Sequence, residues 1–288
     1  MKPAPFEYVP ARSAAEAVDA LARHRDEAKV LAGGQSLVPM LNMRLARPAV
    51  LVDINGALEL DYLREAGGAL VVGALCRQRT LERWAQAGAP LIAEALRWVG
   101  HAAIRNRGTV AGSIAHGDPA SELPALLLCL DGAVVARRAG GERVVPAAEL
   151  YLAPLTTSLA PEELVTEVRV TLPRPGAGWG FAEVARRHGD FALVGAAALL
   201  WRAAGRVAGA RLAFFGGGGR PLRGTAAEAA LAGREPTVAR LREAARAAAA
   251  ELSPDADLHA TADYRRRVAA VLAERTLGAA LARCGGDA

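Results

Sequence analysis

Residues 31–48 read LAGGQSLVPMLNMRLARP. A short apolar run ends at Gly33 and Gly34, Ser36 stands where the N-cap of the next helix is expected, and an amphipathic segment follows. Paired glycines let the chain adopt positive φ and let a ligand approach the backbone closely. A strand, a glycine turn and a helix N-terminus in this order present backbone N–H groups to an anion. The pattern also fits an ordinary tight strand-to-helix turn, so this stretch alone leaves both interpretations open.

The flanking residues place this turn in a β-turn-α-β unit. Ser13 and Glu16 have the spacing of a capping box, which predicts a first helix ending near Arg25. Residues 29–32 are expected to form the strand before the glycines. The apolar run at 49–54 is expected to form a second, buried parallel strand. The unit then occupies about residues 1–55.

A second stretch of similar character, residues 105–124, reads RNRGTVAGSIAHGDPASELP. Neither stretch is a P-loop, because no GxxxxGK[ST] occurs, and neither is a Rossmann fingerprint, because GxGxxG is absent. Both are turns rich in backbone N–H donors and hydroxyl groups. A pair of such turns can hold a diphosphate from two sides through main-chain amides.

The remaining patterns predict the other elements of the chain. Glycine pairs at 67–68 and 140–141 predict hairpins, with strands at 58–64, 69–75, 134–138 and 142–145. Helices are expected at 81–87 after Thr80, at 90–98 and at 125–130, and a strand at 163–172. Further strands are expected at 180–186, 192–202 and 206–215. Helices follow at the capping box of Thr225 and Glu228, at 238–251 and at 263–283.

Prolines and glycines at 173–178 mark the best domain boundary, since they permit neither helix nor regular strand. The sequence therefore predicts an α+β fold in two domains. Residues 1–175 form the first, with subdomains at about 1–55 (an α/β unit) and 56–175 (a mixed sheet with helices). Residues 176–288 form a smaller domain of antiparallel sheet and helices.

Composition excludes several classes of function. The 288 residues are 52% hydrophobic and 23% charged, as in a soluble globular protein, and no apolar run is long enough to span a membrane. The first residues lack the apolar region of a secretion signal, so the cytoplasm is the expected location and membrane insertion is not expected. The net charge is +5, but basic residues are not gathered with aromatic ones, which argues against nucleic-acid binding.

No metal site is predicted. Cys76, Cys129 and Cys284 are far apart, and neither CxxC nor HExxH occurs. An iron–sulfur cluster held by this chain alone would need thiolates at set spacings, and zinc is not expected either.

Together, several motifs make the chain resemble the FAD-binding medium subunit of molybdenum hydroxylases, the relatives of aerobic carbon monoxide dehydrogenase and xanthine dehydrogenase. AGGQSL at 32–37 and RNxGTVxGS at 105–113 carry the resemblance, with HGDPxxELP at 116–124. FxxxxRRxGDFA at 181–192 resembles the start of that family's C-terminal domain, and DLHATAxYRR at 257–266 its late signature. The motifs span nearly the whole chain in the family's order.

The resemblance implies that residues 1–175 are the FAD-binding domain. The first turn would hold the pyrophosphate, the second the other side of the cofactor. Glu122 would lie at the sugar portion and Phe191 near the flavin ring, whereas His116 and Asp118 belong to the motif without an assigned contact. The expected cofactor-binding residues are Leu31, Ala32, Gly33, Gly34, Gln35, Ser36, Leu37, Thr109, Val110, Ala111, Gly112, Ser113, His116, Asp118, Glu122 and Phe191.

Two positions depart from the family pattern. Gln35 stands where some relatives have histidine, and because glutamine cannot bond covalently to flavin, non-covalent FAD is expected. Ala111 replaces a usual glycine, which adds a methyl group against the cofactor and would cost about 1 kcal/mol if positive φ were needed. Valine at Gly33 is expected to abolish FAD retention and to leave the fold largely intact.

The resemblance implies an electron-transfer role for an oxidoreductase subunit with no catalytic acid, base or nucleophile of its own. A large subunit with the molybdenum cofactor would oxidise the substrate, and 2Fe–2S clusters of a small subunit would relay electrons to FAD, in a dimer of heterotrimers. The alternatives are a flavin-binding or assembly protein without turnover, and a self-sufficient non-covalent FAD oxidase. The absence of the covalent-flavin histidine and the small second domain count against the oxidase.

Overall fold

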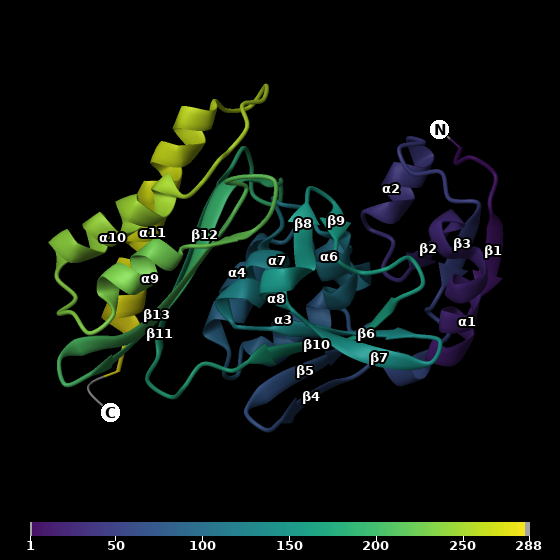
Figure 1. The fold of residues 1–288 in the computed structure, drawn as a ribbon, viewed down its shortest axis with the longest axis horizontal. Helices are drawn as coiled ribbons and strands as arrows, with labels where there is room; N and C mark the ends of the chain where they lie inside the picture. The colour runs from purple at the N-terminus through teal and green to yellow at the C-terminus, as the bar shows by residue number, and fades with distance from the viewer. Residues whose placement is uncertain (1, 286–288) are drawn as a thin grey trace.

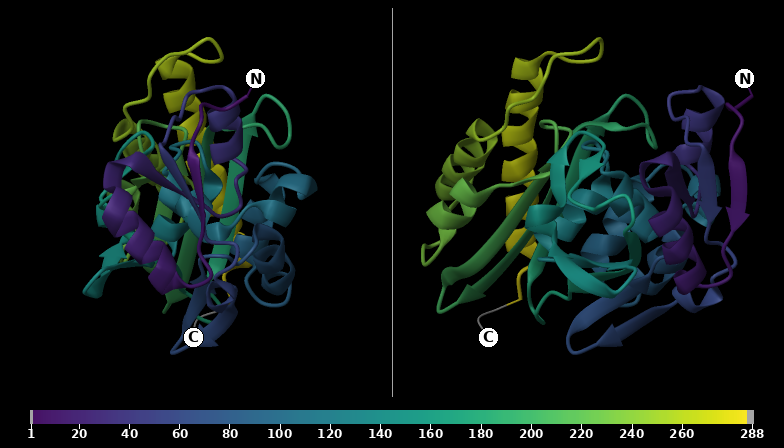
Figure 2. Two further views of the ribbon diagram at one scale, coloured as in Figure 1. Left: turned by 90° about the vertical axis from the view of Figure 1, so that its right-hand side faces the viewer. Right: turned by 45° about the vertical axis from the view of Figure 1, so that its right-hand side comes forward.

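The computed structural model describes residues 2–285. It has three parts side by side, with the N-terminal sheet at the right of Figure 1, a helical and sheet region in the middle, and the C-terminal sheet with its helices at the left. The right view of Figure 2 shows the same succession, and the left view looks along it with the N-terminal part in front. No helix in the described part of the chain is long and apolar enough to cross a membrane.

The N-terminal part is a small parallel sheet with one helix packed on it. Its strands are β1 (Glu7–Pro10), β2 (Ala28–Leu31) and β3 (Val50–Asp53), in the order β1-β3-β2. The other elements are α1 (Ala14–His24), η1 (Arg25–Glu27) and α2 (Leu37–Asn42). Ser13 caps α1 as predicted by accepting a hydrogen bond from Glu16 N, but the Glu16 carboxylate accepts from Arg12 N. The central strand β3 is buried, as expected from its apolar sequence.

The middle part combines helices with an antiparallel sheet. The sheet has the order β4-β5-β10-β6-β7, from β4 (Leu63–Ala66), β5 (Ala69–Gly73), β10 (Leu164–Thr171), β6 (Ala133–Arg138) and β7 (Gly141–Pro146). The helices are α3 (Gln78–Ala85), α4 (Pro90–Trp98), α5 (Ala102–Arg107), α6 (Val110–His116), α7 (Glu122–Cys129) and α8 (Ala147–Leu150). Short elements complete it: η2 (Leu58–Leu60), β8 (Tyr151–Ala153) and β9 (Thr156–Thr157). All pairings in the five-stranded sheet are antiparallel, where a mixed sheet was expected.

The C-terminal part is an antiparallel sheet covered on one face by helices. The strands follow in order as β11 (Gly178–Ala185), β12 (Ala192–Ala203), β13 (Arg206–Phe215) and β14 (Leu222–Arg223). The helices are α9 (Thr225–Leu231), α10 (Val238–Ala250) and α11 (Ala262–Arg283). Glycine lets β11 lie directly on α11, because a Cβ on Gly180 would fall 2.1 Å from Thr276 O. The opposite face of the sheet joins the core of the middle part through buried residues such as Ala197 and Phe215.

Some local predictions are wrong. Helix α3 begins at Gln78, so Thr80 lies inside it and does not cap it. Thr225 is the first residue of α9 rather than its N-cap, and Glu228 instead accepts hydrogen bonds from Leu212 N and Arg223. The expected strand at 58–64 starts only at Leu63, because residues 58–60 form a 3-10 turn.

Candidate functional site

The two glycine turns predicted from the sequence lie against each other. A Cβ on Gly33 would fall 2.5 Å from Arg107 O, 2.7 Å from Gly108 Cα and 2.9 Å from Thr109 N. No real side chain approaches backbone atoms so closely, so glycine is required where the two main chains touch. The first turn follows the carboxyl end of strand β2 in the parallel sheet, and this places Gly33 against the second turn.

The first turn exposes a run of backbone N–H groups. Gly34 has φ 71°, the left-handed conformation that the glycine pair anticipated. Within residues 2–285, the N–H groups from Gly33 to Leu37 donate no hydrogen bond. Ser36 precedes α2, but its hydroxyl makes no capping hydrogen bond, contrary to expectation. Gln35 folds back so that its Nε2 donates to Gly33 O at 3.0 Å.

The second turn is the start of helix α6. Thr109 is the N-cap, and its Oγ1 accepts a hydrogen bond from Gly112 N at 3.1 Å. Gly112 is exposed and Ser113 half-buried, so both are open to a ligand. Glycine at position 112 also leaves room for the capping hydroxyl, because a Cβ there would fall 2.6 Å from Thr109 Oγ1.

Val110 and Ala111 turn into the core. Their side chains are 3% exposed and belong to the main hydrophobic cluster. Ala111 is helical and is not among the described residues with positive φ. The strain anticipated for this alanine therefore does not arise, and its methyl group packs into the core.

The segment after α6 shapes the start of α7. Gly117 ends α6 in the left-handed conformation directly after His116, which is half-buried. The Asp118 carboxylate accepts a hydrogen bond from Ala120 N at 2.8 Å, so this side chain has a structural role in the turn.

Glu122 has an acidic neighbour that the sequence did not predict. Glu122 is buried at the first turn of α7, and burial together with the charge of Asp118 raises its pKa to about 7. Glu183 of β11 is also buried, and burial with the charge of Glu122 raises its pKa to about 8. Neither Glu183 oxygen has a hydrogen-bond partner within residues 2–285. The sequence did contain a signal for this burial. Glu183 alternates with Trp179 and Phe181 along the strand, so its carboxylate lies on the face that these two side chains turn to the core.

Phe191 lies on the loop between β11 and β12. Its ring is 65% exposed. The same loop touches the connection of α4 and α5, where the rings of Trp98 and His188 are 5.1 Å apart and Gly189 lies against His101. The structure thus leaves this aromatic ring uncovered beside the middle part of the chain.

The two C-terminal motifs meet in space. Arg186 lies 3.4 Å from His259 Nδ1. Arg265 donates to Asp257 at 2.7 Å and to the carbonyl oxygens of Leu193 and Gly216, which ties the start of α11 to the sheet. Hydrogen bonds from the His259 and Ala260 N–H groups and from Arg265 lower the pKa of Asp257 to about 2.

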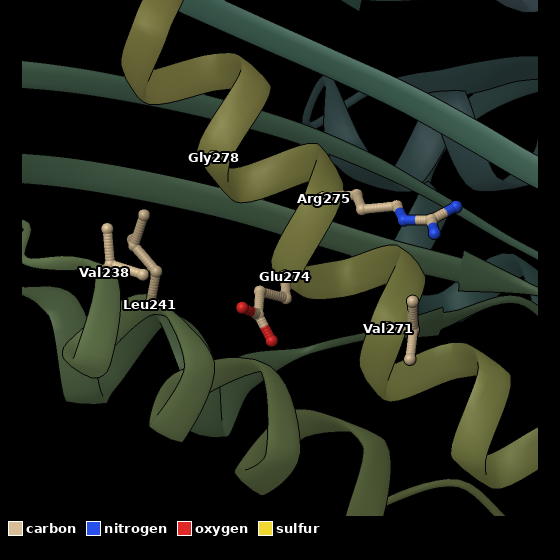
Figure 3. A pocket seen from close by; sticks show the side chains of 6 residues that line it. All are labelled: Val238, Leu241, Val271, Glu274, Arg275 and Gly278. Atoms are coloured by element: carbon tan, nitrogen blue, oxygen red, sulfur yellow. The ribbon is translucent and has the colours of Figure 1, made fainter.

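Other candidate sites are weaker. A hollow of about 340 Å³ lies between α10 and α11, but none of the predicted site residues lines it (Figure 3). Cys76 and Cys129 are buried free thiols, and burial raises the pKa of each to about 12. In the described part of the chain, no group of histidine, cysteine or acidic residues could hold a metal ion.

Comparison with protein families now identifies the chain. Residues 4–175 match the FAD binding domain in molybdopterin dehydrogenase, and residues 179–280 match the CO dehydrogenase flavoprotein C-terminal domain. The chain belongs to the FAD-binding medium subunits of molybdenum hydroxylases. The resemblance stated from the sequence is confirmed, and with it an FAD-binding domain followed by a C-terminal domain of sheet and helices.

Similar proteins cover the whole length of this medium subunit. The alpha subunit of the 6-hydroxypseudooxynicotine dehydrogenase complex of Paenarthrobacter nicotinovorans is 42% identical over 98% of this chain and 97% of its own. Carbon monoxide dehydrogenase from Hydrogenophaga pseudoflava matches with a TM-score of 0.96, at 39% identity, over 99% of this chain and 100% of the other. Quinoline 2-oxidoreductase from Pseudomonas putida 86 matches with a TM-score of 0.91, at 34% identity, over 98% and 99%.

The residues at the two turns fit FAD. The unbonded N–H groups of the first turn are the donors that a diphosphate needs, and Gly33 lets the second turn lie directly beside them. Ser36 and Ser113 add hydroxyl groups. Glu183, a buried acid without a hydrogen-bond partner within residues 2–285, lies near Glu122.

Proposed function

We propose that this medium subunit transfers electrons from the iron–sulfur clusters of a partner subunit through FAD to an acceptor. The observation that carries the proposal is the contact of the two glycine turns, which places the free N–H donors of residues 33–37 beside the start of helix α6. Membership in a family named for FAD binding in molybdopterin dehydrogenases supports it.

The main chain would hold the cofactor. The N–H groups from Gly33 to Leu37 would bind the diphosphate, and residues 109–113 would bind from the other side. Glu122 would lie at the sugar portion, and the exposed ring of Phe191 would cover the flavin. FAD supplies the redox chemistry when bound, and this chain positions it and shields it from water.

The partners would carry the other cofactors. Relatives are named as subunits of dehydrogenase complexes, which supports a large subunit with the molybdenum cofactor and a small subunit with 2Fe–2S clusters. We propose a dimer of heterotrimers, in which residues 1–175 and 176–288 form the two domains of each medium subunit. The cytoplasmic location expected from the sequence stays a prediction.

A visible spectrum of the purified chain tests the binding step. The expected result is flavin absorbance that survives desalting, or that returns after incubation with FAD and a second desalting. Acid treatment should release all the flavin, since Gln35 cannot form a covalent bond. A chain that stays colourless in added FAD would exclude the flavoprotein function.

Electron delivery distinguishes the alternatives. The FAD-loaded chain is mixed anaerobically with the reduced iron–sulfur subunit, and rapid bleaching of the flavin absorbance is expected. A flavin that the partner cannot bleach would favour an assembly role without turnover. Bleaching of the isolated chain by a small alcohol would favour the self-sufficient oxidase.

A further inference from the structure

A chain of side-chain hydrogen bonds connects the two glycine turns behind their contact. The amide of Asn55 donates from Nδ2 to Ala32 O at 2.9 Å, directly before Gly33. Its Oδ1 accepts from Arg77 Nη2 at 2.8 Å. Arg77 Nη1 in turn donates to Arg107 O at 2.7 Å, directly before the second turn. Two side chains thus join a carbonyl group of each turn.

The orientation of Asn55 is fixed by an acid on its other side. Asp53 Oδ1 accepts from both Asn55 N, at 2.9 Å, and Asn55 Nδ2, at 2.6 Å. Tyr8 OH donates to Asp53 Oδ2 at 2.6 Å, which holds that carboxylate in place. Because a carboxylate only accepts, the amide must turn its NH₂ group toward Asp53 and Ala32 and its oxygen toward Arg77.

Arg77 is anchored at its backbone as well. Gln78 N donates to Gly108 O at 2.8 Å, and Val110 N donates to Cys76 O at 3.1 Å, so the main chain on both sides of Arg77 is bonded to the second turn. The guanidinium group therefore starts from the second turn and reaches toward the first. A planar group with several fixed donors suits such a two-ended contact, which a lysine cannot reproduce.

The charge of Arg77 is not paired directly. In the part of the chain that the structure describes, no carboxylate lies within ion-pair distance of its guanidinium group, which bonds to neutral oxygens. Burial and the nearby charge of Arg107 lower its pKa, while Asp53 and Asp61 act against this from a longer distance. The half-buried guanidinium group thus uses two of its donors to join Arg107 O to Asn55 Oδ1.

We propose that Arg77 and Asn55 are positioning residues that set the spacing of the two glycine turns, and that the affinity of these turns for a dinucleotide diphosphate depends on this spacing. The inference rests on the proposed function, because it takes the turns as the FAD site. Neither side chain is assigned a contact with the cofactor; both act through Ala32 O and Arg107 O.

The test measures FAD affinity in the full-length chain. FAD is removed, and the protein is titrated with FAD while flavin fluorescence is recorded. Arg77→Gln and Asn55→Ala are each expected to weaken binding about tenfold, the typical effect of a lost hydrogen bond to a charged or buried group. The double variant should bind FAD with about the affinity of the more severely affected single variant, because both substitutions interrupt the same series of hydrogen bonds. The exposed Arg83 of α3 gives the control, because Arg83→Gln removes the same charge and should leave affinity unchanged.

Two further measurements separate positioning from other roles. Hydrogen exchange of the FAD-free variants should rise at Val110, Gly112 and Ser113, whose N–H groups are hydrogen-bonded in the second turn. It should not rise in the C-terminal sheet, and a general loss of stability would not produce this pattern. Arg77→Lys keeps the charge but not the two-ended contact, so it should not restore affinity.

The outcomes are distinguishable. An unchanged FAD affinity in Arg77→Gln, or a wild-type FAD affinity in Arg77→Lys, would overturn the inference. In either case, FAD binding by the wild-type chain would still support the proposed function. A wild-type chain that binds no FAD would overturn the proposed function first, and this inference with it.

Discussion

A Cβ on Gly33 would lie 2.9 Å from the backbone nitrogen of Thr109, so the two turns touch through their main chains with no room for a side chain. These residues are far apart in sequence. Their contact turns two unremarkable loops into one surface, and it also means that the first turn cannot be altered at Gly33 without moving the second.

Gly33→Val is therefore a poorer test of the site than the sequence suggested. The new side chain would overlap Arg107 O and Gly108 Cα, so the variant is expected to disturb the contact of the two turns as well as FAD retention. Even Gly33→Ala is expected to lower both FAD retention and the thermal unfolding temperature. Gly88→Ala is the matched control, since a Cβ there meets nothing within 4 Å. Retention of FAD by Gly33→Ala at the wild-type level would contradict the contact.

Ser36→Ala separates binding from stability. The Ser36 hydroxyl makes no capping bond and the residue is exposed, so its removal should leave the unfolding temperature unchanged. If the first turn holds the diphosphate, loss of this hydroxyl should weaken FAD binding several-fold, as expected for about one hydrogen bond. Calorimetric titration with FAD measures the change. If Ser36→Ala binds FAD with the same dissociation constant as the wild type, the Ser36 hydroxyl does not contact the cofactor.

Glu183 predicts a pH dependence of stability. Its pKa is raised from 4.5 to about 8 in the folded chain by burial and by Glu122, whose own pKa is raised to about 7. The folded state then holds protons that the unfolded state has released. The stability from these groups is fully present below pH 4.5 and is lost as pH rises toward about 8.

Glu183→Gln removes the ionisable group and keeps the shape. At about pH 8 the FAD-free variant should unfold a few degrees above the wild type, and at about pH 5 the difference should be small. Differential scanning calorimetry at both pH values measures this. An equal difference at the two pH values would show that Glu183 is not the group responsible.

Features with a local cause could be predicted from the sequence. The cap at Ser13, the paired glycines of the hairpins and the long helix of residues 263–283 each depend on neighbours in the chain, and each is present within one or two residues of the prediction. Strand β1 was missed because Glu7–Pro10 has no apolar run and pairs only as an edge strand with β3. Helix α6 was missed because Gly112 interrupts its sequence, and helix α5 because it has only six residues and ends directly before Gly108.

The site was predictable as a set of motifs but not as an arrangement. Gly33 and Gly112 were identified by residue type. That Ala111 would turn into the core, or that Glu183 would lie beside Glu122, depends on packing between elements distant in sequence. Asn55 and Arg77 belong to no motif, and only their hydrogen bonds reveal them.

A buried ion pair supports the second turn. Arg105 bonds to both Glu82 oxygens, at 3.0 and 3.3 Å, and to the carbonyl oxygens of Val99 and Gly100. Arg105→Met is expected to destabilise the chain by about 3 kcal/mol, because it leaves buried acceptors without donors. Arg79→Met is the control, since Arg79 is more exposed and bonds once to Glu82, so about 1 kcal/mol or less is expected. Equal urea-unfolding free energies for the two variants would contradict this.

Phe191 offers the most direct test of where the flavin ring lies. Its side chain is 65% exposed and contributes little to the core, so Phe191→Ser should leave the unfolding temperature of the FAD-free chain unchanged. If the ring covers the flavin, its loss should expose bound flavin to water and raise flavin fluorescence, because stacking on an aromatic ring quenches it. The control is Leu258→Ser, at a residue that is 89% exposed on a different loop and should alter neither property. Fluorescence of the bound flavin equal to that of the wild type, at full FAD occupancy, would place the flavin ring away from Phe191.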